Sequence, residues 1–326
     1  MSLILNKSSV LSGSFLSISG SKSESNRLLI LKALYPNITI LNLSKSDDTN
    51  VLHKALTSNS DIVDIHHAGT AMRFLTAFFA ISKSGDITLT GSNRMQNRPI
   101  KILVDALRQL GAEIEYIEND GFPPIKITGQ ELTATRVSLP ANVSSQYISA
   151  LLLIAPSLQN GLELELIGEI TSIPYINMTL KLLNEINVET TFVNNKIVVK
   201  PLDQDPKSKT LIVESDWSSA SYYYSLVALS PNSEVTLSSY KKNSLQGDSV
   251  LVSIYEKLGV KTTFNKNTVT LSNQPSTFNN QQQLTLDLIN APDIAQTIAV
   301  TCFGLGVACF LSGLHTLKIK ETDRLV

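Results

Sequence analysis

Apolar residues recur along the chain with two different spacings. Where they return every three or four residues, the pattern predicts helices, and this occurs over residues 24–34, 71–79, 144–155, 218–229 and 294–303. Where every second residue is apolar, the pattern predicts short strands, as at 87–90 and 162–166. Helices and strands alternate along the chain, so the sequence predicts a mixed α/β fold with many short strands.

One arrangement of these elements is repeated. Residues 102–129, 178–200 and 250–272 each read as a helix, a tight turn, a strand, a polar turn and a second strand. Gly111, Asn187 and Gly259 end the three helices, and these residue types accept the left-handed conformation common at helix C-termini. The three positions lie 76 and 72 residues apart. This period is too long for a solenoid repeat and indicates a larger unit reused within two domains.

The length agrees with two domains, because the chain has 326 residues and domains average roughly 150. The repeats place the joints between domains near Gly20 and near Glu214. No stretch rich in Pro, Gly or Ser marks a linker.

Composition excludes several classes of protein. Charged residues make up 17%, and 27 Lys and Arg against 28 Asp and Glu leave a net charge of −1. Such a balance gives no basic footprint for nucleic acid, and the aliphatic content argues against disorder. The apolar window 294–311 contains polar residues and glycines, which favours a buried helix, a turn and a strand over a membrane span. The N-terminus lacks a secretory pattern, so we expect a cytoplasmic protein.

Metal and disulfide chemistry find little support. The two cysteines, Cys302 and Cys309, cannot form a disulfide framework, and no Cys/His spacing is typical of zinc. The adjacent His66 and His67 are expected on opposite sides of an extended strand, which favours structural or surface histidines.

Candidate chemistry gathers at helix starts. Lys22 and Arg27 flank the start of the first predicted helix, where free N–H groups attract anions; a solvated cap with two incidental cations is an equally open interpretation. Gly69 begins a second such turn and allows close approach of a ligand to the backbone, although an ordinary helix start is as well supported. The polar loop at 93–98 holds Arg94 and Arg98.

Arginine is scarce and clustered. Five of the seven arginines fall in these few segments, namely Arg27, Arg73, Arg94, Arg98 and Arg324. Because the guanidinium group suits phosphate and carboxylate, the clustering favours an anionic small-molecule substrate.

Other segments offer hydroxyls and carboxylates. Ser144, Ser145 and Gln146 could orient a sugar-like polyol, whereas plain N-capping by Ser144 is the alternative. The tyrosines of segment 222–224 are assigned to the core. Asp293 and the terminal run 320–324 supply carboxylates and cations of the kind used in acid–base catalysis, although by itself such a run is typical of a solvated surface.

Together these segments form an ordered set: GSKSESNR, AGTAMR, LTGSNRMQNRP followed by LVDAL, VSSQY, PYINMTL, SSASYYY, QGDSVL, PDIAQTIA and KETDRL. The set resembles the 5-enolpyruvylshikimate-3-phosphate (EPSP) synthase family of enolpyruvyl transferases, and the resemblance extends from Gly20 to Leu325.

The resemblance implies a fold of two similar domains, each made of three βαβαββ units. The first domain would comprise residues 1–20 plus 214–326, and the second residues 21–213. It also implies transfer of the enolpyruvyl group of phosphoenolpyruvate to the 5-hydroxyl of shikimate 3-phosphate, through a tetrahedral intermediate and with release of phosphate. This is a step of the shikimate pathway to chorismate and the aromatic amino acids. No metal or organic cofactor is implied, and we expect a monomer.

The resemblance also implies roles for individual residues. Lys22 would contact phosphoenolpyruvate and assist proton transfer, Asp293 would accept the proton of the 5-hydroxyl, and Glu321 would protonate the methylene carbon. Shikimate 3-phosphate would be bound by Lys22, Ser23, Arg27, Ser144, Ser145, Gln146, Ser172, Tyr175, Asp293 and Lys320. Phosphoenolpyruvate would be bound by Lys22, Gly69, Arg98, Gln146 and Arg324.

The sequence departs from the family pattern at several places. His67 stands where asparagine is common, and Phe74 follows Arg73 where many members have proline. Gly69 is where glyphosate-tolerant members often change, so its presence predicts sensitivity to that inhibitor. The family also continues beyond KETDRL with a further arginine and lysine for phosphoenolpyruvate. We therefore expect a C-terminally truncated chain that does not turn over substrate alone.

Two rival functions remain. The related transferases that act on UDP-N-acetylglucosamine usually carry a reactive cysteine on a loop of the second domain, whereas Cys302 and Cys309 lie far along the sequence from that loop. The other rival is a shikimate-phosphate binding fragment without catalysis.

Overall fold

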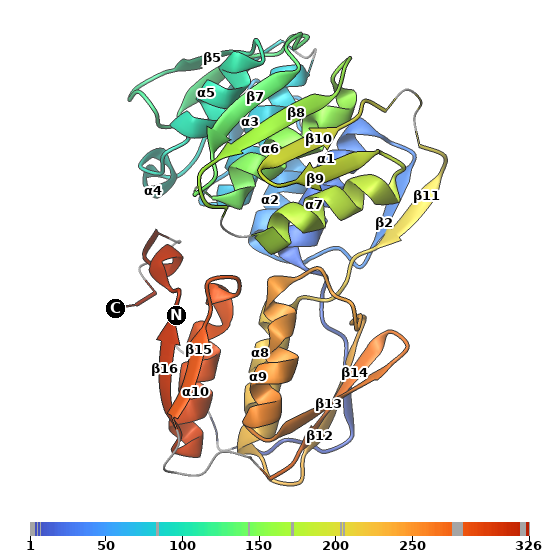
Figure 1. Cartoon of the computed structure of the whole chain (residues 1–326), viewed down its shortest axis with the longest axis vertical. Coiled ribbons are helices and arrows are strands. Elements are labelled where there is room, and N and C mark those ends of the chain that lie inside the picture. Colours follow the sequence, from blue (N-terminus) through green and yellow to red (C-terminus); the bar gives the residue numbers. More distant parts are fainter. Residues whose placement is uncertain are drawn as a thin grey trace. The chain divides into compact units, whose positions relative to one another are not determined.

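The computed structural model describes residues 4, 6, 8–82, 85–142, 144–170, 173–202, 204, 206–275, 283–319, 324 and 325. The chain divides into two compact units (Figure 1). We call residues 1–20 with 214–326 unit 1, and residues 21–213 unit 2.

Three helices that are buried almost all round form the interior of unit 2. They are α1 (Lys22–Leu34), α3 (Gly69–Ile81) and α6 (Ser145–Ile154). Their sequences are apolar on more than one face, and such helices are stable only when neighbours cover every side. The neighbours include the helices α2 (Asp47–Leu56), α5 (Lys101–Gln109) and α7 (Ile173–Glu185).

Sheets complete unit 2. In one four-stranded sheet the order is β3-β4-β6-β5, and in another it is β7-β8-β10-β9, while β2 and β11 form a parallel pair. The strands are β2 (Ile38–Leu41), β3 (Ile62–Asp64), β4 (Asp86–Thr90), β5 (Glu113–Tyr116), β6 (Ile125–Thr128), β7 (Arg136–Pro140), β8 (Leu162–Ile167), β9 (Thr190–Val193), β10 (Lys196–Val199) and β11 (Lys209–Ile212). Short helical turns lie at α4 (Asn93–Gln96) and η1 (Ala155–Ser157).

Unit 1 repeats this architecture. One sheet has the order β1-β12-β14-β13, and β15 pairs with β16 in parallel. The strands are β1 (Ser14–Leu16), β12 (Glu234–Ser238), β13 (Val260–Asn265), β14 (Thr268–Asn273), β15 (Gln283–Asp287) and β16 (Ala308–Ser312). The helical segments are α8 (Trp217–Leu229), η2 (Gly247–Val250), α9 (Leu251–Lys257), η3 (Pro292–Ile294), α10 (Ala295–Leu305) and η4 (His315–Ile319).

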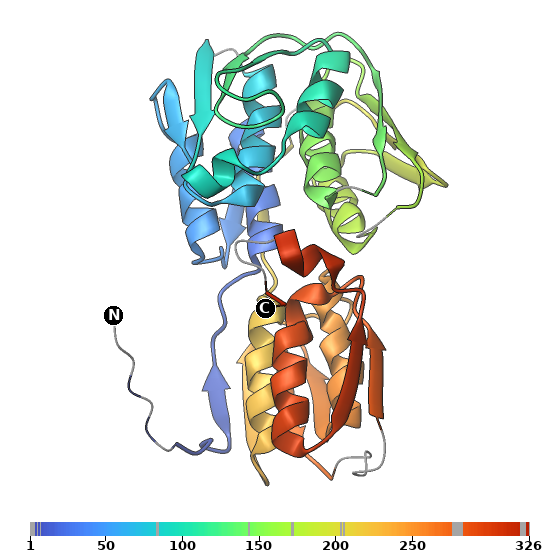
Figure 2. The same cartoon turned by 90° about the vertical axis from the view of Figure 1, so that its left-hand side faces the viewer.

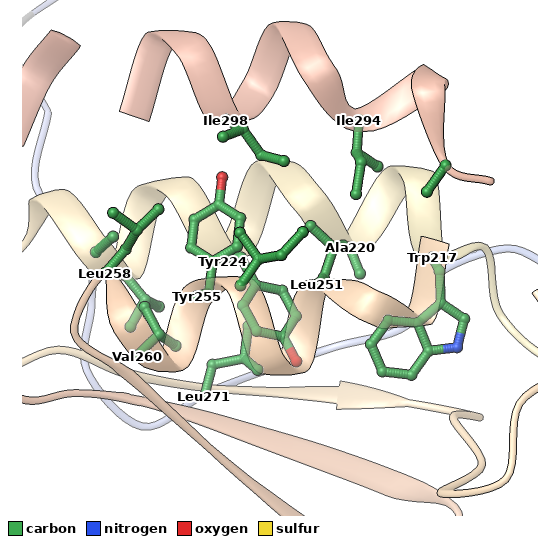
Figure 3. Close-up of a cluster of buried hydrophobic side chains, with 14 of the residues drawn as sticks. Trp217, Ala220, Tyr224, Leu251, Tyr255, Leu258, Val260, Leu271, Ile294 and Ile298 are labelled. Carbon is green, nitrogen blue, oxygen red and sulfur yellow. The ribbon is translucent and has the colours of Figure 1, made fainter. Parts of the chain in front are cut away.

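Aromatic side chains lie among the aliphatic residues in the core of unit 1. Helix α10 lies alongside α8 (Figure 2). Of the η3–α10 segment, Ile298 points toward the rings of Tyr224 of α8 and Tyr255 of α9, and Ile294 points toward Ala220 of α8 (Figure 3). The two tyrosine ring centroids are 5.2 Å apart, and the strands close the core from the other side. Burial raises the pKa of both phenols well above the ordinary value, so both remain neutral.

The predicted repeat is present. In each of the three four-stranded sheets, a parallel pair is followed by an antiparallel hairpin, formed by β5 with β6, β9 with β10, and β13 with β14. The helix before each hairpin is followed by a residue of positive φ, at Gly111 (105°), Asn187 (66°) and Gly259 (88°). The expectation that these three residues turn the chain is therefore confirmed.

Some local expectations were wrong. Residues 93–96 form the helical turn α4 instead of a loop, because Oγ of Ser92 accepts a hydrogen bond from the Met95 amide. His66 has a φ of 50° and lies in a turn, where its amide donates to Oδ1 of Asp64, so the histidines do not follow an extended strand. Of the tyrosines assigned to the core, Tyr224 is buried but Tyr222 is 65% exposed, because it lies on the outer face of α8.

The apolar window 294–311 divides as expected. Helix α10 ends at Leu305, Gly306 takes a φ of 67°, and β16 follows. In the described part of the chain, no helix combines the length and apolar character needed to cross a membrane.

Candidate active site

The interior helices of unit 2 and the neighbouring α7 carry polar side chains near their N-termini and are mainly apolar further along. Because each helix is enclosed, these polar side chains are buried with it. They are Ser25, Asn26 and Arg27 on α1, Thr70, Arg73 and Thr76 on α3, Ser145 and Ser149 on α6, and Thr179 on α7. Apart from Thr76, these side chains lie in the first two turns of their helices, and they form a buried polar layer at one end of the bundle, where helix N-termini supply positive potential.

Arg27 joins three helices within this layer. Its Nε donates to Oγ1 of Thr179 at 2.8 Å, and its Nη2 donates to Oγ of Ser149 at 2.8 Å. Nη2 also lies 3.4 Å from the Tyr175 carbonyl oxygen, and Nη1 donates to the Ser23 carbonyl at 2.8 Å. The guanidinium group is thus held by α1, α6 and α7 together.

Two aromatic rings accompany the same group. Cζ of Arg27 lies 5.5 Å from the ring centroid of Phe74 and 5.9 Å from that of Tyr175. Burial lowers the pKa of Arg27 to about 10, while the charges of Tyr175 and Glu24 act in the opposite direction. The group therefore remains protonated at neutral pH and places a positive charge in the interior.

Gly69 and Arg98 lie in direct contact. A Cβ atom on Gly69 would stand 2.7 Å from Nη1 and 3.1 Å from Cζ of Arg98, so only glycine lets the guanidinium group lie against the start of α3 in this way. Nearby, Nε2 of Gln146 donates to Oγ1 of Thr70 at 3.1 Å. This bond joins the first turns of α3 and α6.

Arg73 connects the start of α3 with the segment that carries Arg98. Its Nη1 donates to the Gly69 carbonyl and its Nη2 to the Pro99 carbonyl, both at 3.1 Å. The Tyr147 hydroxyl donates to the same Pro99 carbonyl at 2.6 Å. The main chain on both sides of the Gly69–Arg98 contact is therefore supported by buried side chains.

In unit 1, Asp293 and Arg324 form an ion pair. Nη1 of Arg324 lies 3.0 Å from Oδ1 of Asp293, and each side chain is about a quarter exposed. The amide of Arg324 donates to the Leu317 carbonyl of η4 at 3.2 Å, so Arg324 contacts η4 through its main chain and Asp293 of η3 through its side chain. The structure thus brings together two of the predicted site residues in this unit.

The remaining predicted residues are distributed as follows. Lys22 and Ser23 open α1 and are half-buried. Ser144 is the N-cap of α6, and its Oγ accepts from the Gln146 amide at 3.4 Å. Ser145 is buried on α6. Ser172, Lys320 and Glu321 lie outside the described residues.

Sequence reasoning missed Ser149, Thr179 and Thr70 as partners of the site. Ser149 and Thr179 each follow a predicted residue by four positions, since Ser145 and Tyr175 precede them on the same helix faces. A polar residue one turn further into an apolar helix was the available signal. Within the residues that the structure describes, no group of three or more His, Cys, Asp or Glu side chains could hold a metal ion.

Solved structures with the same architecture define the fold class. An EPSP synthase from Acinetobacter baumannii superposes with a TM-score of 0.72 at 19% identity, covering 97% of this chain and 78% of that one. The enolpyruvyl transferase NikO from Streptomyces tendae gives 0.62 at 12% identity, covering 89% and 73%. The chain therefore has the mixed α/β enolpyruvyl transferase fold, as predicted.

Sequence similarity specifies the family within that class. The family model described as EPSP synthase (3-phosphoshikimate 1-carboxyvinyltransferase) matches residues 52–326. A 3-phosphoshikimate 1-carboxyvinyltransferase from Bacteroides fragilis is 48% identical over 307 residues, covering 94% of this chain and 73% of the relative. One from Colwellia psychrerythraea is 36% identical over 340 residues, covering 94% and 77%. The chain belongs to the EPSP synthase family, as its motifs predicted.

Proposed function

We propose that this chain serves the transfer of the enolpyruvyl group from phosphoenolpyruvate to the 5-hydroxyl of shikimate 3-phosphate, with release of phosphate. Membership of the EPSP synthase family supports the reaction. The observation that carries the proposal is the buried polar layer of unit 2 around Arg27, together with the half-buried Arg98 and Gln146, which lie at the first turns of α3 and α6. Such a layer suits two anionic substrates.

Unit 2 is assigned the binding of shikimate 3-phosphate. Arg27 is charged and buried among hydroxyls, which suits an anionic group that is itself removed from water. Ser23, Ser144, Ser145, Gln146 and Tyr175 surround the same helix starts and can orient the hydroxyls of the ring. The resemblance further assigns to this substrate Lys22 and Ser172 of unit 2, and Asp293 and Lys320 of unit 1.

Phosphoenolpyruvate is assigned to Lys22, Gly69, Arg98, Gln146 and Arg324. The contact of Arg98 with Gly69 supports this, since the guanidinium group lies against a helix start with no side chain between them. Asp293 is assigned as the base for the 5-hydroxyl proton and Glu321 as the acid for the methylene carbon. Separate carboxylates are needed because one must be ionised when the other is protonated.

Calorimetric titration of the chain with shikimate 3-phosphate tests the assignment of unit 2. We expect saturable binding, and much weaker binding of shikimate, which lacks the phosphate. Failure to bind shikimate 3-phosphate would overturn the proposal.

A pair of arginine variants tests the assignment of Arg98. With the chain saturated in shikimate 3-phosphate, Arg98→Lys should weaken binding of phosphoenolpyruvate on the order of tenfold, because lysine cannot replace a planar, bidentate donor. Arg94→Lys is the matched control, since Arg94 lies in the same segment and is exposed. Equal effects of the two variants would contradict the assignment.

Phosphate release in the presence of both substrates distinguishes catalysis from binding alone. The binding-only alternative is favoured by one observation, namely that Arg27, Ser144, Ser145, Gln146 and Tyr175 all belong to unit 2. The expectations that this chain does not turn over substrate alone, that it is a monomer and that it is cytoplasmic stay predictions. Both cysteines lie in α10 and β16 of unit 1, so neither offers the reactive loop cysteine of the UDP-N-acetylglucosamine enzymes.

A further inference from the structure

The donors of Arg27 are almost fully used by the protein. A guanidinium group has five N–H bonds. One on Nε, one on Nη1 and two on Nη2 are directed to Thr179, Ser23, Ser149 and the Tyr175 carbonyl. Among the described residues, a single N–H on Nη1 is therefore left for a ligand. This remaining N–H bond lies in the plane of the guanidinium group, so the direction in which it points depends on how firmly that plane is held.

Hydrogen bonds hold the edge of the Arg27 guanidinium plane, and two aromatic rings lie close to the group. Phe74 is 1% exposed, and its ring centroid lies 5.5 Å from Cζ of Arg27. The attraction between a cation and a ring is strongest where water is excluded, as it is here. Phe74 follows Arg73 at a position where many members of the family have proline, and a proline ring has no π face.

We propose that Phe74 is a positioning residue that orients the guanidinium group of Arg27 for recognition of an anionic group of shikimate 3-phosphate. This inference rests on the proposed function. In this role, the phenyl ring of Phe74 affects the affinity for the substrate through Arg27, without contacting the substrate itself. Tyr175 contributes the second ring, with its centroid 5.9 Å from Cζ of Arg27. Of the two rings, only that of Phe74 stands at a position where many family members have proline.

Two matched substitutions in α3 test the proposal. Phe74→Leu removes the ring next to Arg27, and Phe79→Leu makes the same change at another buried phenylalanine, 7% exposed, of the same helix. Both leave a similar cavity, so both should lower the midpoint of urea unfolding. Phe74→Leu should weaken binding of shikimate 3-phosphate on the order of tenfold, whereas Phe79→Leu should leave the dissociation constant within about twofold.

A double-mutant cycle separates positioning from packing. In the background of Arg27→Lys, which keeps the charge but lacks the planar group, Phe74→Leu should have almost no further effect on the dissociation constant, because the planar group that the ring orients is already absent. A purely structural role predicts the same loss in both backgrounds. Urea unfolding of the same four proteins, namely the parent, the two single variants and the double variant, measures how much the contact between the ring and the guanidinium group stabilises the fold in the absence of ligand.

The outcomes are distinguishable. Suppose that the unsubstituted chain binds shikimate 3-phosphate. If Phe74→Leu and Phe79→Leu then lower the affinity equally, or if the losses of affinity in the cycle are additive, this inference is wrong and the proposed function stands. Absence of binding by the unsubstituted chain would overturn both.

Discussion

Arg27 and Arg73 are buried almost equally, with 3% and 4% of their surfaces exposed, yet they are held differently. Arg27 is bound by two hydroxyl groups from two other helices and by two main-chain carbonyls, whereas Arg73 has no hydroxyl partner among the residues that the structure describes, is bound by main-chain carbonyls at 69 and 99, and lies 3.6 Å from Sδ of Met95. The two hydroxyl partners of Arg27 can turn toward a ligand while its two carbonyl contacts keep the guanidinium group in place, but the two oxygen partners described for Arg73 are carbonyls that belong to the backbone. The difference indicates that Arg27 serves recognition and that Arg73 serves as a brace.

The two arginines also differ in whether Nε has a hydrogen-bond acceptor. Nε of Arg27 donates to Thr179, while Nε of Arg73 has no hydrogen-bond partner in the described part of the chain. A buried unsatisfied donor costs about 1–3 kcal/mol. Arg73 nevertheless remains buried, with Cζ 5.8 Å from the centroid of the Tyr147 ring, which is consistent with a structural role.

The largest effect is expected from Arg27→Met. This substitution removes a buried charge and leaves two hydroxyls and two carbonyls without their donor, so binding of shikimate 3-phosphate should fall by about a hundredfold or more. Calorimetry measures the loss. Arg136→Met is the control, because the Arg136 side chain is 79% exposed and pairs at the surface with Glu163. Binding within about threefold of the parent would contradict the assignment of Arg27.

Arg73→Met should act on stability more than on affinity. Without the bonds to the Gly69 and Pro99 carbonyls, the free energy of unfolding should fall by about 2–3 kcal/mol, measured by urea denaturation. The loss of affinity for shikimate 3-phosphate should stay well below that caused by Arg27→Met. If the two variants impair binding equally, the division between recognition and brace is wrong.

Gly69→Ala should have a narrower effect. The new Cβ would meet Nη1 of Arg98 at 2.7 Å, but the end of a flexible side chain can move aside, so unfolding should change by less than about 1 kcal/mol. The displaced guanidinium group should weaken phosphoenolpyruvate binding on the order of tenfold and leave the affinity for shikimate 3-phosphate unchanged. Titration with each ligand in turn checks the difference.

The smallest effect is expected at the exposed pair of Asp86 and Lys126. Hydrogen bonds from Lys126 and Thr128 lower the pKa of the Asp86 carboxyl. The native state therefore favours the ionised form, and this contribution is present above the unfolded pKa of about 3.9 and is lost as the pH falls through the native value.

Asp86→Asn should consequently lower the urea midpoint slightly at neutral pH and not at all in strong acid. High salt should abolish the difference at neutral pH, because the pair is exposed to solvent. A large effect that persists in high salt would contradict the contrast between buried and exposed charges.

Much of the fold could be predicted because it depends on local pattern. The five predicted helices are present with ends shifted by a few residues, and Gly111, Asn187 and Gly259 turn the chain as their residue types suggest. The turn at His66 could not be predicted in this way, because an aspartate side chain two residues earlier captures its amide. Local side-chain bonds of this kind compete with the periodic pattern.

The sequence by itself determined the helices, the three hairpins, the repeat and, through the motifs, the family. Only the tertiary structure decided which polar side chains share the interior: Arg27 meets Ser149 and Thr179, which lie 122 and 152 residues further along the chain. The periodicity of apolar residues shows which face of a helix is buried, but it does not show which other helix or sheet packs against that face. Partners across such distances are chosen by the packing of whole helices and sheets, in which most buried donors find an acceptor.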